Sequence, residues 1–275
     1  MTDFSGKTAF VTGGAQGIGF AIAEALAKRG ANIMLADINE AGLIAAQEKL
    51  SKLNTQVDHC ICDVPTADAV QAGADKTIER FGKVHYVVNN AGVGLGGEVG
   101  ETPLKDWRWI VDINLMGVVY GCEIFTPLIK SHGEGGHIIN TASMAGHVSL
   151  GGMGPYHATK FAVVGYSECI RQELALHNIG VSALCPGWVQ TEIHLSSKNS
   201  PTNAGVTAEP NEQFMEIADL IENGLEPSRL GEWVCDSIAA NRAYIFTHPD
   251  MRPAIEMRYH ALQADYEACD EHFGE

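Results

Sequence analysis

The stretch T-G-G-A-Q-G-I-G at Thr12–Gly19 decides the fold of this chain. It follows a short apolar run, Thr8–Val11, and leads directly into Ile18–Arg29, where Ala, Ile and Leu recur with helical spacing. Glycines permit a tight turn and a close approach of the backbone to a ligand, and a helix N-terminus presents free N–H groups to a phosphate. A strand, a glycine loop and a helix in this order predict a dinucleotide-binding site, with a simple tight turn as the alternative.

Short apolar runs recur along the rest of the chain, and helix-like segments separate them. The runs are apolar on both faces, which is typical of parallel strands covered on both sides. Alternating β and α segments of this length predict an α/β fold with one doubly wound (Rossmann) parallel sheet and helices on both faces. The expected strands are Thr8–Val11, Asn32–Ala36, Val57–Cys62, Val84–Val88, His137–Ile139, Val181–Leu184 and Ala243–Phe246.

The length of 275 residues fits a single domain, 1–275, in which two regions interrupt the alternation. Residues 192–226 begin apolar, become polar and small, and end in a helical stretch, as expected of a substrate lid or a disordered loop. In the tail, 250–275, the apolar residues that share one helical face are Ile255, Tyr259 and Leu262. We expect this tail to form a helix packed on its own domain, with a partner-binding arm as the alternative.

Composition excludes several classes of function. The chain has 18 basic and 34 acidic side chains, a formal net charge of −16, so nucleic-acid phosphates and anionic membranes would repel it. We therefore expect a small-molecule substrate and neither a nucleic-acid nor a membrane partner. The seven cysteines include no C-x-x-C pair, which favours reduced thiols, a cytoplasmic protein and no metal site. No signal peptide is visible, and no uncharged apolar run approaches the roughly 20 residues of a membrane span.

The end of the second expected strand indicates which dinucleotide is bound. Asp37 lies 18 residues after Gly19, where a carboxylate can accept hydrogen bonds from the adenosine ribose hydroxyls. The same charge would repel a 2′-phosphate, and the glycine loop carries Gln16 where a basic residue could have bound one. These residues predict NAD rather than NADP, unless Asp37 is only a turn or cap residue.

Tyr156 and Lys160 are the strongest catalytic candidates. They are four residues apart, so they share a face if this segment is helical. A tyrosine pKa of about 10 must fall by roughly 3 units, or about 4 kcal/mol, before the side chain exchanges protons readily near pH 7. The nearby ammonium and a positively charged nicotinamide ring are plausible causes of such a shift. Ser143, after the preceding strand, could donate a hydrogen bond to a carbonyl oxygen, or could act only as a helix cap.

Other small or polar residues follow the expected strands and face the same crevice, because ligands bind at the carboxyl ends of parallel strands. Asp63 follows the third strand and could meet an adenine, and Asn89–Gly92 follows the fourth and would let a cofactor lie close. Asn114 interrupts a helical stretch, where its amide is expected to bind backbone or water. Pro186–Thr191 follows the sixth strand on the nicotinamide side.

Seven motifs in this order resemble the short-chain dehydrogenase/reductase superfamily over roughly residues 5–250. They are T-G-x-x-x-G-I-G at Thr12–Gly19, Asp63-Val64, N-N-A-G at Asn89–Gly92, Asn114, Ser143, Y-x-x-x-K at Tyr156–Lys160 and P-G-x-x-x-T at Pro186–Thr191. The resemblance implies that Tyr156 is the general acid/base and that Lys160 binds the nicotinamide ribose and lowers the tyrosine pKa. It also implies that Ser143 positions the substrate oxygen and that Asn114 holds a water in a proton relay behind Lys160.

The resemblance implies a set of contacts with NAD (NADH) as well. Asp63 would meet the adenine and Thr191 the nicotinamide carboxamide. The expected cofactor-binding residues are Gly13, Gln16, Gly17, Ile18, Gly19, Asp37, Asp63, Val64, Asn90, Ala91, Gly92, Tyr156, Lys160, Pro186, Gly187, Val189 and Thr191. Relatives are usually tetramers or dimers paired through two long helices, here 104–130 and 155–177, so a homo-oligomer is implied.

The variable segments around the site suggest the substrate. The expected substrate contacts are Leu95, Ser143, Met153, Tyr156, Trp188 and Ile193. Most are apolar, and these segments hold no arginine or lysine before Lys198 to pair with a phosphate or carboxylate. We expect a bulky, mostly apolar secondary alcohol or ketone of steroid or aryl type, unless many of these residues are core or oligomer contacts.

Taken together, these residues predict an NAD-dependent alcohol dehydrogenase or ketone reductase. One alternative is a regulatory or scaffold protein that binds NAD(H) without turnover, although such a protein would not need a proton relay. Another is an NADP-dependent acyl-carrier ketoreductase, which Asp37, Gln16 and the small number of basic residues disfavour.

Overall fold

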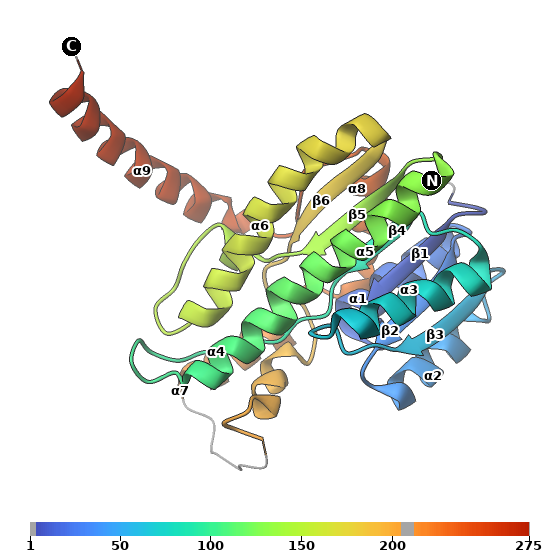
Figure 1. Cartoon of the computed structure of the whole chain (residues 1–275). Helices are drawn as coiled ribbons and strands as arrows, with labels where there is room; N and C mark the ends of the chain where they lie inside the picture. Colours follow the sequence, from blue (N-terminus) through green and yellow to red (C-terminus); the bar gives the residue numbers. More distant parts are fainter. Residues whose placement is uncertain (1–3, 205–211, 275) are drawn as a thin grey trace.

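The computed structural model describes residues 4–204 and 212–274, with side chains in the second range described from Met215 onward. Seven parallel strands form one sheet in the order β3-β2-β1-β4-β5-β6-β7 (Figure 1). The strands are β1 (Thr8–Thr12), β2 (Asn32–Asp37), β3 (Val57–Ile61), β4 (Tyr86–Asn89), β5 (Gly136–Thr141), β6 (Ile179–Cys185) and β7 (Tyr244–Phe246). The predicted α/β fold with a doubly wound parallel sheet is confirmed, and each expected strand overlaps an observed one.

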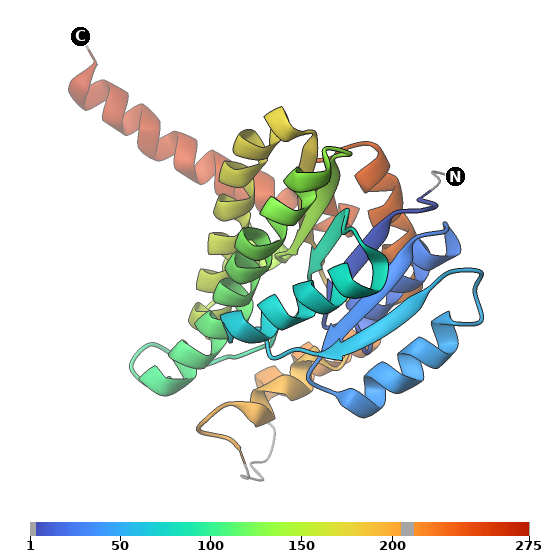
Figure 2. The same ribbon diagram turned by 45° about the vertical axis from the view of Figure 1, so that its right-hand side comes forward.

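Helices cover both faces of the sheet (Figures 1 and 2). One layer contains α1 (Gly17–Lys28), α2 (Glu40–Leu50) and α8 (Pro227–Ala239). The other contains α3 (Ala67–Phe81), α5 (Gly117–His132) and α6 (Gly154–Leu174). Strand β2 shows how both layers are built, because Ile33 and Leu35 belong to the core under the first layer and Met34 to the core under the second. All three side chains are fully buried, so the strand is continuously apolar.

The strand order places a crevice between β1 and β4. The chain adds β2 and β3 on one side of β1, then crosses over to add β4 on the other side. Consecutive crossovers on opposite sides of a strand leave an opening at the carboxyl ends of the two central strands. The glycine loop after β1 and the N-N-A-G segment after β4 both lie there.

A long helical segment follows β4. It comprises α4 (Leu104–Val111), one stretch of π-helix (Asp112–Met116) and α5. By length and composition, Leu104–His132 could cross a membrane, a test that core helices of folded proteins also pass. Here the inner side chains, such as Phe125 and Ile129, are buried against the sheet, which identifies a layer helix of the fold.

The insertion and the tail differ in how they contact the fold. A 3-10 segment (Ile193–Asn199) and α7 (Glu212–Glu222) form the described parts of the insertion, and residues 205–211 of the expected lid lie outside the described residues. The tail forms α9 (Arg252–Phe273), as expected, but none of its residues is buried. The expectation that it packs on its own domain is therefore wrong. An amphipathic pattern shows that a helix has an apolar face, and it does not show which surface covers that face.

All seven cysteines are free thiols. Cys169 and Cys269 are exposed, whereas the other five are buried in the core or at its edge. Burial raises the pKa of these five thiols, to about 11 for Cys60 and about 12 for Cys62, Cys122, Cys185 and Cys235.

Candidate active site

A cavity of about 450 Å³ opens at the carboxyl ends of the central strands. Most predicted site residues line it, and the exceptions are Gly19, Leu95 and Asn114. The predicted residues that line the cavity are Gly13, Gln16, Gly17, Ile18, Asp37, Asp63, Val64, Asn90, Ala91, Gly92, Ser143, Met153, Tyr156, Lys160, Pro186, Gly187, Trp188, Val189, Thr191 and Ile193. Residues from seven segments of the sequence therefore meet at one opening.

The glycine loop has a geometry that only glycine permits. Gly13 and Gly17 have φ values of +62° and +57°, which side chains disfavour. A Cβ on Gly19 would lie 2.1 Å from the carbonyl oxygen of Gly13, so the first turn of α1 can approach the loop only without a side chain. That turn has no side-chain cap and no acidic residue. Its N–H groups therefore form a cradle that fits a phosphate.

Asp37 is held at the edge of the cavity by backbone groups. Its Oδ2 accepts a hydrogen bond from the N–H of Ala15 at 3.1 Å, and its Oδ1 accepts one from Asn39 at 3.0 Å. Gln16, at the same edge, donates from Nε2 to Glu192 at 3.1 Å. The glycine loop is therefore linked to the first residues of the insertion, a contact that the sequence analysis did not anticipate.

Thr12 fixes the N-N-A-G segment to the end of β1. Its Oγ1 accepts hydrogen bonds from the N–H groups of Asn90 and Ala91 at 2.9 and 3.0 Å. The Asn90 amide donates back to the carbonyl of Thr12 at 3.0 Å. These bonds hold the backbone at the base of the cavity in place, where small residues leave room for a ligand.

Asn114 lies in the π-helical stretch, with its side chain fully buried. Its Oδ1 accepts from the N–H of Val93 at 2.8 Å. Its Nδ2 donates to the Val93 carbonyl at 2.9 Å and to the Thr159 hydroxyl at 3.3 Å. The side-chain amide was expected to bind backbone or water, and the structure shows bonds to the backbone. Asn114 therefore holds the loop after Gly92 from behind the cavity.

Tyr156 and Lys160 lie on the first turns of α6, and the Lys160 Nζ is 5.6 Å from the centre of the Tyr156 ring. Nζ donates to the carbonyl of Thr141 at 2.8 Å. Burial lowers the pKa of Lys160 to about 8. Burial also raises the pKa of Tyr156, and a hydrogen bond with Ser143 opposes that rise only in part. The expected lowering of the tyrosine pKa by Lys160 is therefore not found among the protein's own groups, because desolvation of the phenolate outweighs them.

Ser143 follows β5 and combines the two roles considered for it. Its Oγ accepts from the N–H of Ala145 at 3.1 Å, which caps a short 3-10 turn, and donates to the carbonyl of Pro186 at 3.3 Å. The same hydroxyl opposes the rise in the pKa of Tyr156, so the two side chains lie close together. A hydroxyl held by the backbone beside the tyrosine is suited to orient a substrate oxygen.

Two histidines that the sequence analysis left out of the site support its walls. His157 contacts the Ala145 carbonyl at 2.9 Å and accepts from the N–H of Leu150 at 3.1 Å, and thus holds the loop beside Tyr156. His248 accepts from the N–H of Gly187 at 3.1 Å, and its other ring nitrogen lies 2.9 Å from the Trp188 carbonyl. His157 is adjacent in sequence to Tyr156, which was a usable signal, whereas His248 is far from every motif.

Much of the cavity lining is apolar. Beyond the predicted Met153, Trp188 and Ile193, the apolar lining residues include Val148, Leu150, Ile217, Ile221 and Met251. Leu95, one of the predicted substrate contacts, is only 5% exposed and does not line the cavity. Its loop directs the side chain into the protein interior, where a leucine is as favourable as in an apolar pocket. Among the described lining residues, Lys160 is the only lysine or arginine.

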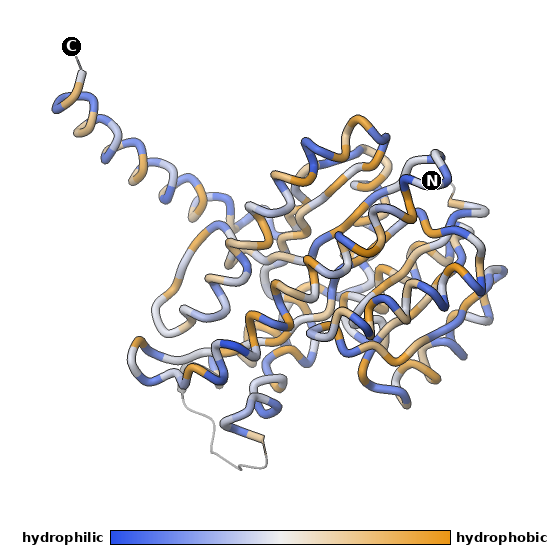
Figure 3. The backbone as a smooth tube through the Cα atoms, viewed as in Figure 1, coloured by the Kyte–Doolittle hydropathy of each residue, from blue (hydrophilic) through white to orange (hydrophobic). Residues whose placement is uncertain are grey.

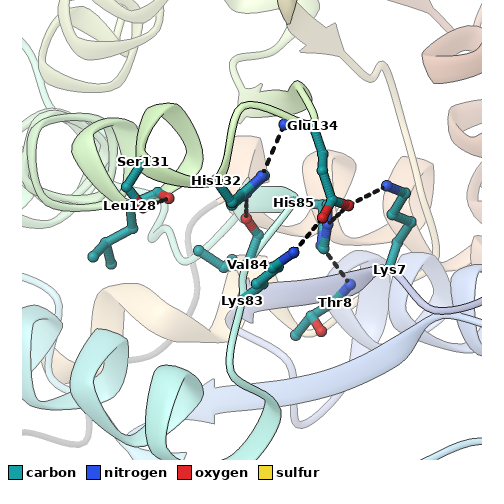
Figure 4. Close-up of polar contacts among 9 residues, drawn as sticks. All are labelled: Lys7, Thr8, Lys83, Val84, His85, Leu128, Ser131, His132 and Glu134. Atoms are coloured by element: carbon teal, nitrogen blue, oxygen red, sulfur yellow. Dashed lines mark hydrogen bonds and ion pairs between the residues drawn. The ribbon is translucent and has the colours of Figure 1, made fainter.

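One group outside the cavity, among the described residues, has a spacing that could hold a metal ion: His85, His132 and Glu134 (Figure 4). Each ring nitrogen of the two histidines already lies within hydrogen-bond distance of a backbone group or of Glu134. The Glu134 carboxylate also pairs with Lys7 and Lys83, which hold its pKa well below the usual range. Two ammonium groups at this carboxylate disfavour a cation, so the cluster is best described as an ion-pair network at the end of the sheet opposite the cavity.

Comparisons with known proteins identify the family of this chain. A family model described as short chain dehydrogenase matches residues 7–201. The chain is 34% identical over 276 residues to a CLA biosynthesis dehydrogenase/reductase of Lactiplantibacillus plantarum, covering 96% of each protein. It is 35% identical over 204 residues to 3beta-hydroxysteroid dehydrogenase 2 of Eggerthella lenta, covering 74% of this chain and 78% of that protein.

A solved structure shares the whole arrangement. A short-chain dehydrogenase/reductase from Burkholderia phymatum, crystallised in complex with NAD, superposes with a TM-score of 0.91 at 35% identity. The match covers 96% of this chain and 97% of that one. The glycine cradle, the Tyr156–Lys160 pair and these matches lead to one conclusion: the chain belongs to the short-chain dehydrogenase/reductase family of oxidoreductases.

Proposed function

We propose that this protein is an NAD-dependent oxidoreductase that interconverts a secondary alcohol and a ketone. The observation that carries the proposal is the convergence of Ser143, Tyr156 and Lys160 on one cavity whose other end carries a phosphate cradle. When bound, the nicotinamide group accepts the hydride from the carbinol carbon or returns it to the ketone.

The chain's own residues manage the oxygen and its proton. Ser143 donates a hydrogen bond that orients the substrate oxygen, and the Tyr156 hydroxyl exchanges the proton with that oxygen. In oxidation, the hydroxyl proton passes to the tyrosinate while the carbonyl forms, and in reduction the same proton returns. The ammonium of Lys160, 5.6 Å from the centre of the tyrosine ring, and a cationic nicotinamide ring would together oppose the desolvation of the tyrosinate.

The preference for NAD rests on the environment of Asp37. Backbone N–H groups fix both of its oxygens at the cavity edge, where they would accept hydrogen bonds from ribose hydroxyls. No arginine or second lysine lines the described cavity to pair with a 2′-phosphate. Turnover with NAD should therefore exceed turnover with NADP, and Asp37→Ala should erode that ratio. An unchanged ratio would refute the role of Asp37.

The substrate is proposed to be bulky and mostly apolar, of steroid or aryl type. The support is the largely apolar lining of the cavity, together with α7, whose Ile217 and Ile221 face into it. We propose that residues 192–226, of which 205–211 lie outside the described residues, cover the bound substrate. A relative whose name states a 3beta-hydroxysteroid dehydrogenase activity supports the same substrate class.

The deciding experiment follows NADH formation from NAD across secondary alcohols, from small polyols to aryl alkanols and hydroxysteroids. Wild type should turn over the bulky alcohols, and Tyr156→Phe should lose turnover while NADH still binds, as measured by fluorescence. Saturable turnover of polyols alone would refute the substrate class. Undiminished turnover by Tyr156→Phe would refute the mechanism.

We also propose a homo-oligomer paired through α5 and α6, as a dimer or a tetramer. The outward residues of α5, such as Ile124 and Leu128, are apolar and only half-buried, as expected of a face that a second copy covers. Light scattering on the purified protein tests this directly, since a monomer at micromolar concentration would contradict it.

A further inference from the structure

Helix α9 has an apolar face that its own chain leaves uncovered. It begins after Met251 and extends away from the fold in both views (Figures 1 and 2). Its 22 residues correspond to about 33 Å of helix. The cation of Arg258 lies over the Phe161 ring at 5.2 Å, near the start of the helix, and no α9 residue is buried. Since most helices in proteins are stabilised by packing of an apolar face, a helix with no buried residue lacks that stabilisation.

The apolar residues of α9 form a continuous stripe. Hydrophobic and hydrophilic residues alternate along the helix (Figure 3). The stripe comprises Ile255, Tyr259, Leu262, Tyr266, Cys269 and Phe273. The intervals between them alternate between four and three residues, which is the spacing of the contact seam of a coiled coil. Tyr266 and Phe273 are 72% and 77% exposed, so the far half of the stripe is open to contact.

The stripe is symmetric about Ala264, which indicates how two copies would pair. If two α9 helices lie antiparallel with Ala264 opposite Ala264, every stripe residue faces a stripe residue of the partner helix. The facing pairs are Ile255 with Phe273, Tyr259 with Cys269, and Leu262 with Tyr266. An interface of this kind, in which the same surface patch serves both subunits, is the commonest way for two copies to close a dimer.

The distribution of charged residues along α9 also favours antiparallel pairing. The first half of α9 carries two arginines, Arg252 and Arg258, and one acidic residue, Glu256, which pairs with Arg252 at 2.7 Å. The second half carries no lysine or arginine. The acidic residues of the second half are Asp265, Glu267, Asp270 and Glu271. Antiparallel pairing places the arginine-bearing half of each helix beside the acidic half of the other, whereas parallel pairing would place the two acidic halves together.

We propose that α9 is a self-association arm, which pairs antiparallel with α9 of a second copy along this stripe. The stripe lies on α9 and not on α5 or α6, so this contact adds to any pairing through those helices. It does not depend on the proposed reaction.

Disulfide trapping tests both the surface and the direction. The background variant Cys169→Ser leaves Cys269 as the only exposed cysteine of the described residues. Adding Tyr259→Cys places a second thiol opposite the partner's native Cys269, so mild oxidation should convert most of the protein to a covalent dimer on a non-reducing gel. The matched control is Met257→Cys, which is 73% exposed but lies off the stripe, and it should stay monomeric on the gel.

Each alternative gives a different result. Efficient cross-linking through Cys269 in the background variant alone would indicate parallel pairing and overturn the proposal. Equal cross-linking of Tyr259→Cys and Met257→Cys would indicate random collision and would also overturn it. If Tyr259→Cys gives no cross-link, α9 covers some other surface, such as the body of a second copy, and the antiparallel arm is refuted.

A second pair of variants tests the stripe without cross-linking. Leu262→Glu places a charge at the centre of the seam, and Met257→Glu places the same charge on the opposite side of the same helix. Light scattering should show a lower assembly mass for Leu262→Glu only, with the far-UV circular dichroism of the folded body retained in both. Equal masses for the two variants and the wild type would contradict the proposal.

Discussion

Replacement of Lys160 by methionine should make the protein more stable while it abolishes turnover. The Lys160 side chain is 3% exposed, and burial lowers the pKa of its ammonium from 10.5 to about 8. A shift of this size corresponds to about 3 kcal/mol of unfolding free energy lost at pH 7, where both folded and unfolded states carry the charge. The substitution also removes the hydrogen bond to the Thr141 carbonyl, which offsets roughly 1 to 2 kcal/mol. We expect a net gain of about 1 to 2 kcal/mol for Lys160→Met at pH 7.

The pH dependence of the stability difference distinguishes burial of the Lys160 charge from simple repacking of the side chain. Between pH 8 and 10.5 the unfolded state binds more protons at this lysine than the folded state, so wild-type stability rises with pH. The wild type should therefore recover about 2 kcal/mol relative to Lys160→Met between pH 7 and 9.5.

Urea unfolding followed by tryptophan fluorescence at the two pH values measures both differences. Lys130→Met, on the exposed side of α5, serves as the control and should change stability by less than about 0.5 kcal/mol. A Lys160→Met variant less stable than wild type at pH 7, or a gap that does not change with pH, would refute the reasoning.

Three further predictions concern other parts of the structure. Gly19→Ala forces a methyl group against the Gly13 carbonyl, so NADH should no longer raise the melting temperature, whereas Gly165→Ala, with open space around its Cβ, should keep that response. His137 is buried, and burial lowers its pKa to about 3, so the unfolded state binds a proton at this residue first as the pH drops. His137→Gln should therefore reduce the loss of unfolding free energy between pH 7.5 and 5 by about 2 kcal/mol, as measured by urea unfolding. An acid sensitivity equal to that of the wild type would count against this. His248→Ala removes both contacts to the backbone of the cavity floor and should raise KM for the cofactor severalfold more than it lowers kcat; a change confined to kcat would contradict a positioning role.

The parts of the molecule that sequence reasoning predicted are those that local pattern determines. The β2 run, Asn32–Asp37, is apolar on both faces because helices cover both, and that run is visible without tertiary information. Tyr156 and Lys160 share a helix face because of their spacing alone. The glycine loop was equally visible in the sequence, since glycine is the residue that most readily adopts the φ values at Gly13 and Gly17.

The remainder depends on contacts between segments far apart in the sequence. Leu95 has the side chain of either a core or a pocket residue, and only the path of its loop decides between them. His248 reaches Gly187 from the end of β7, 61 residues later, and nothing near either residue indicates the contact. For α9, the apolar stripe was predicted correctly and its partner was not.

The pKa of Tyr156 shows a different limit. Sequence spacing indicates that a cation lies near, but it does not indicate how deeply the phenol is buried. Desolvation depends on every segment that surrounds the phenol, so its size is available only from the folded structure.

Burial of Cys62 has a consequence for how the protein withstands oxidants. This thiol lines the cavity beside Asp63, where small electrophiles and peroxide could reach it. Because the thiolate is the reactive form, a pKa of about 12 leaves only about one molecule in 30,000 reactive at pH 7.5. Oxidative modification should instead begin at Cys169, which is exposed and lies outside the cavity. The cysteine in the binding pocket of this oxidoreductase is therefore protected from oxidation and alkylation.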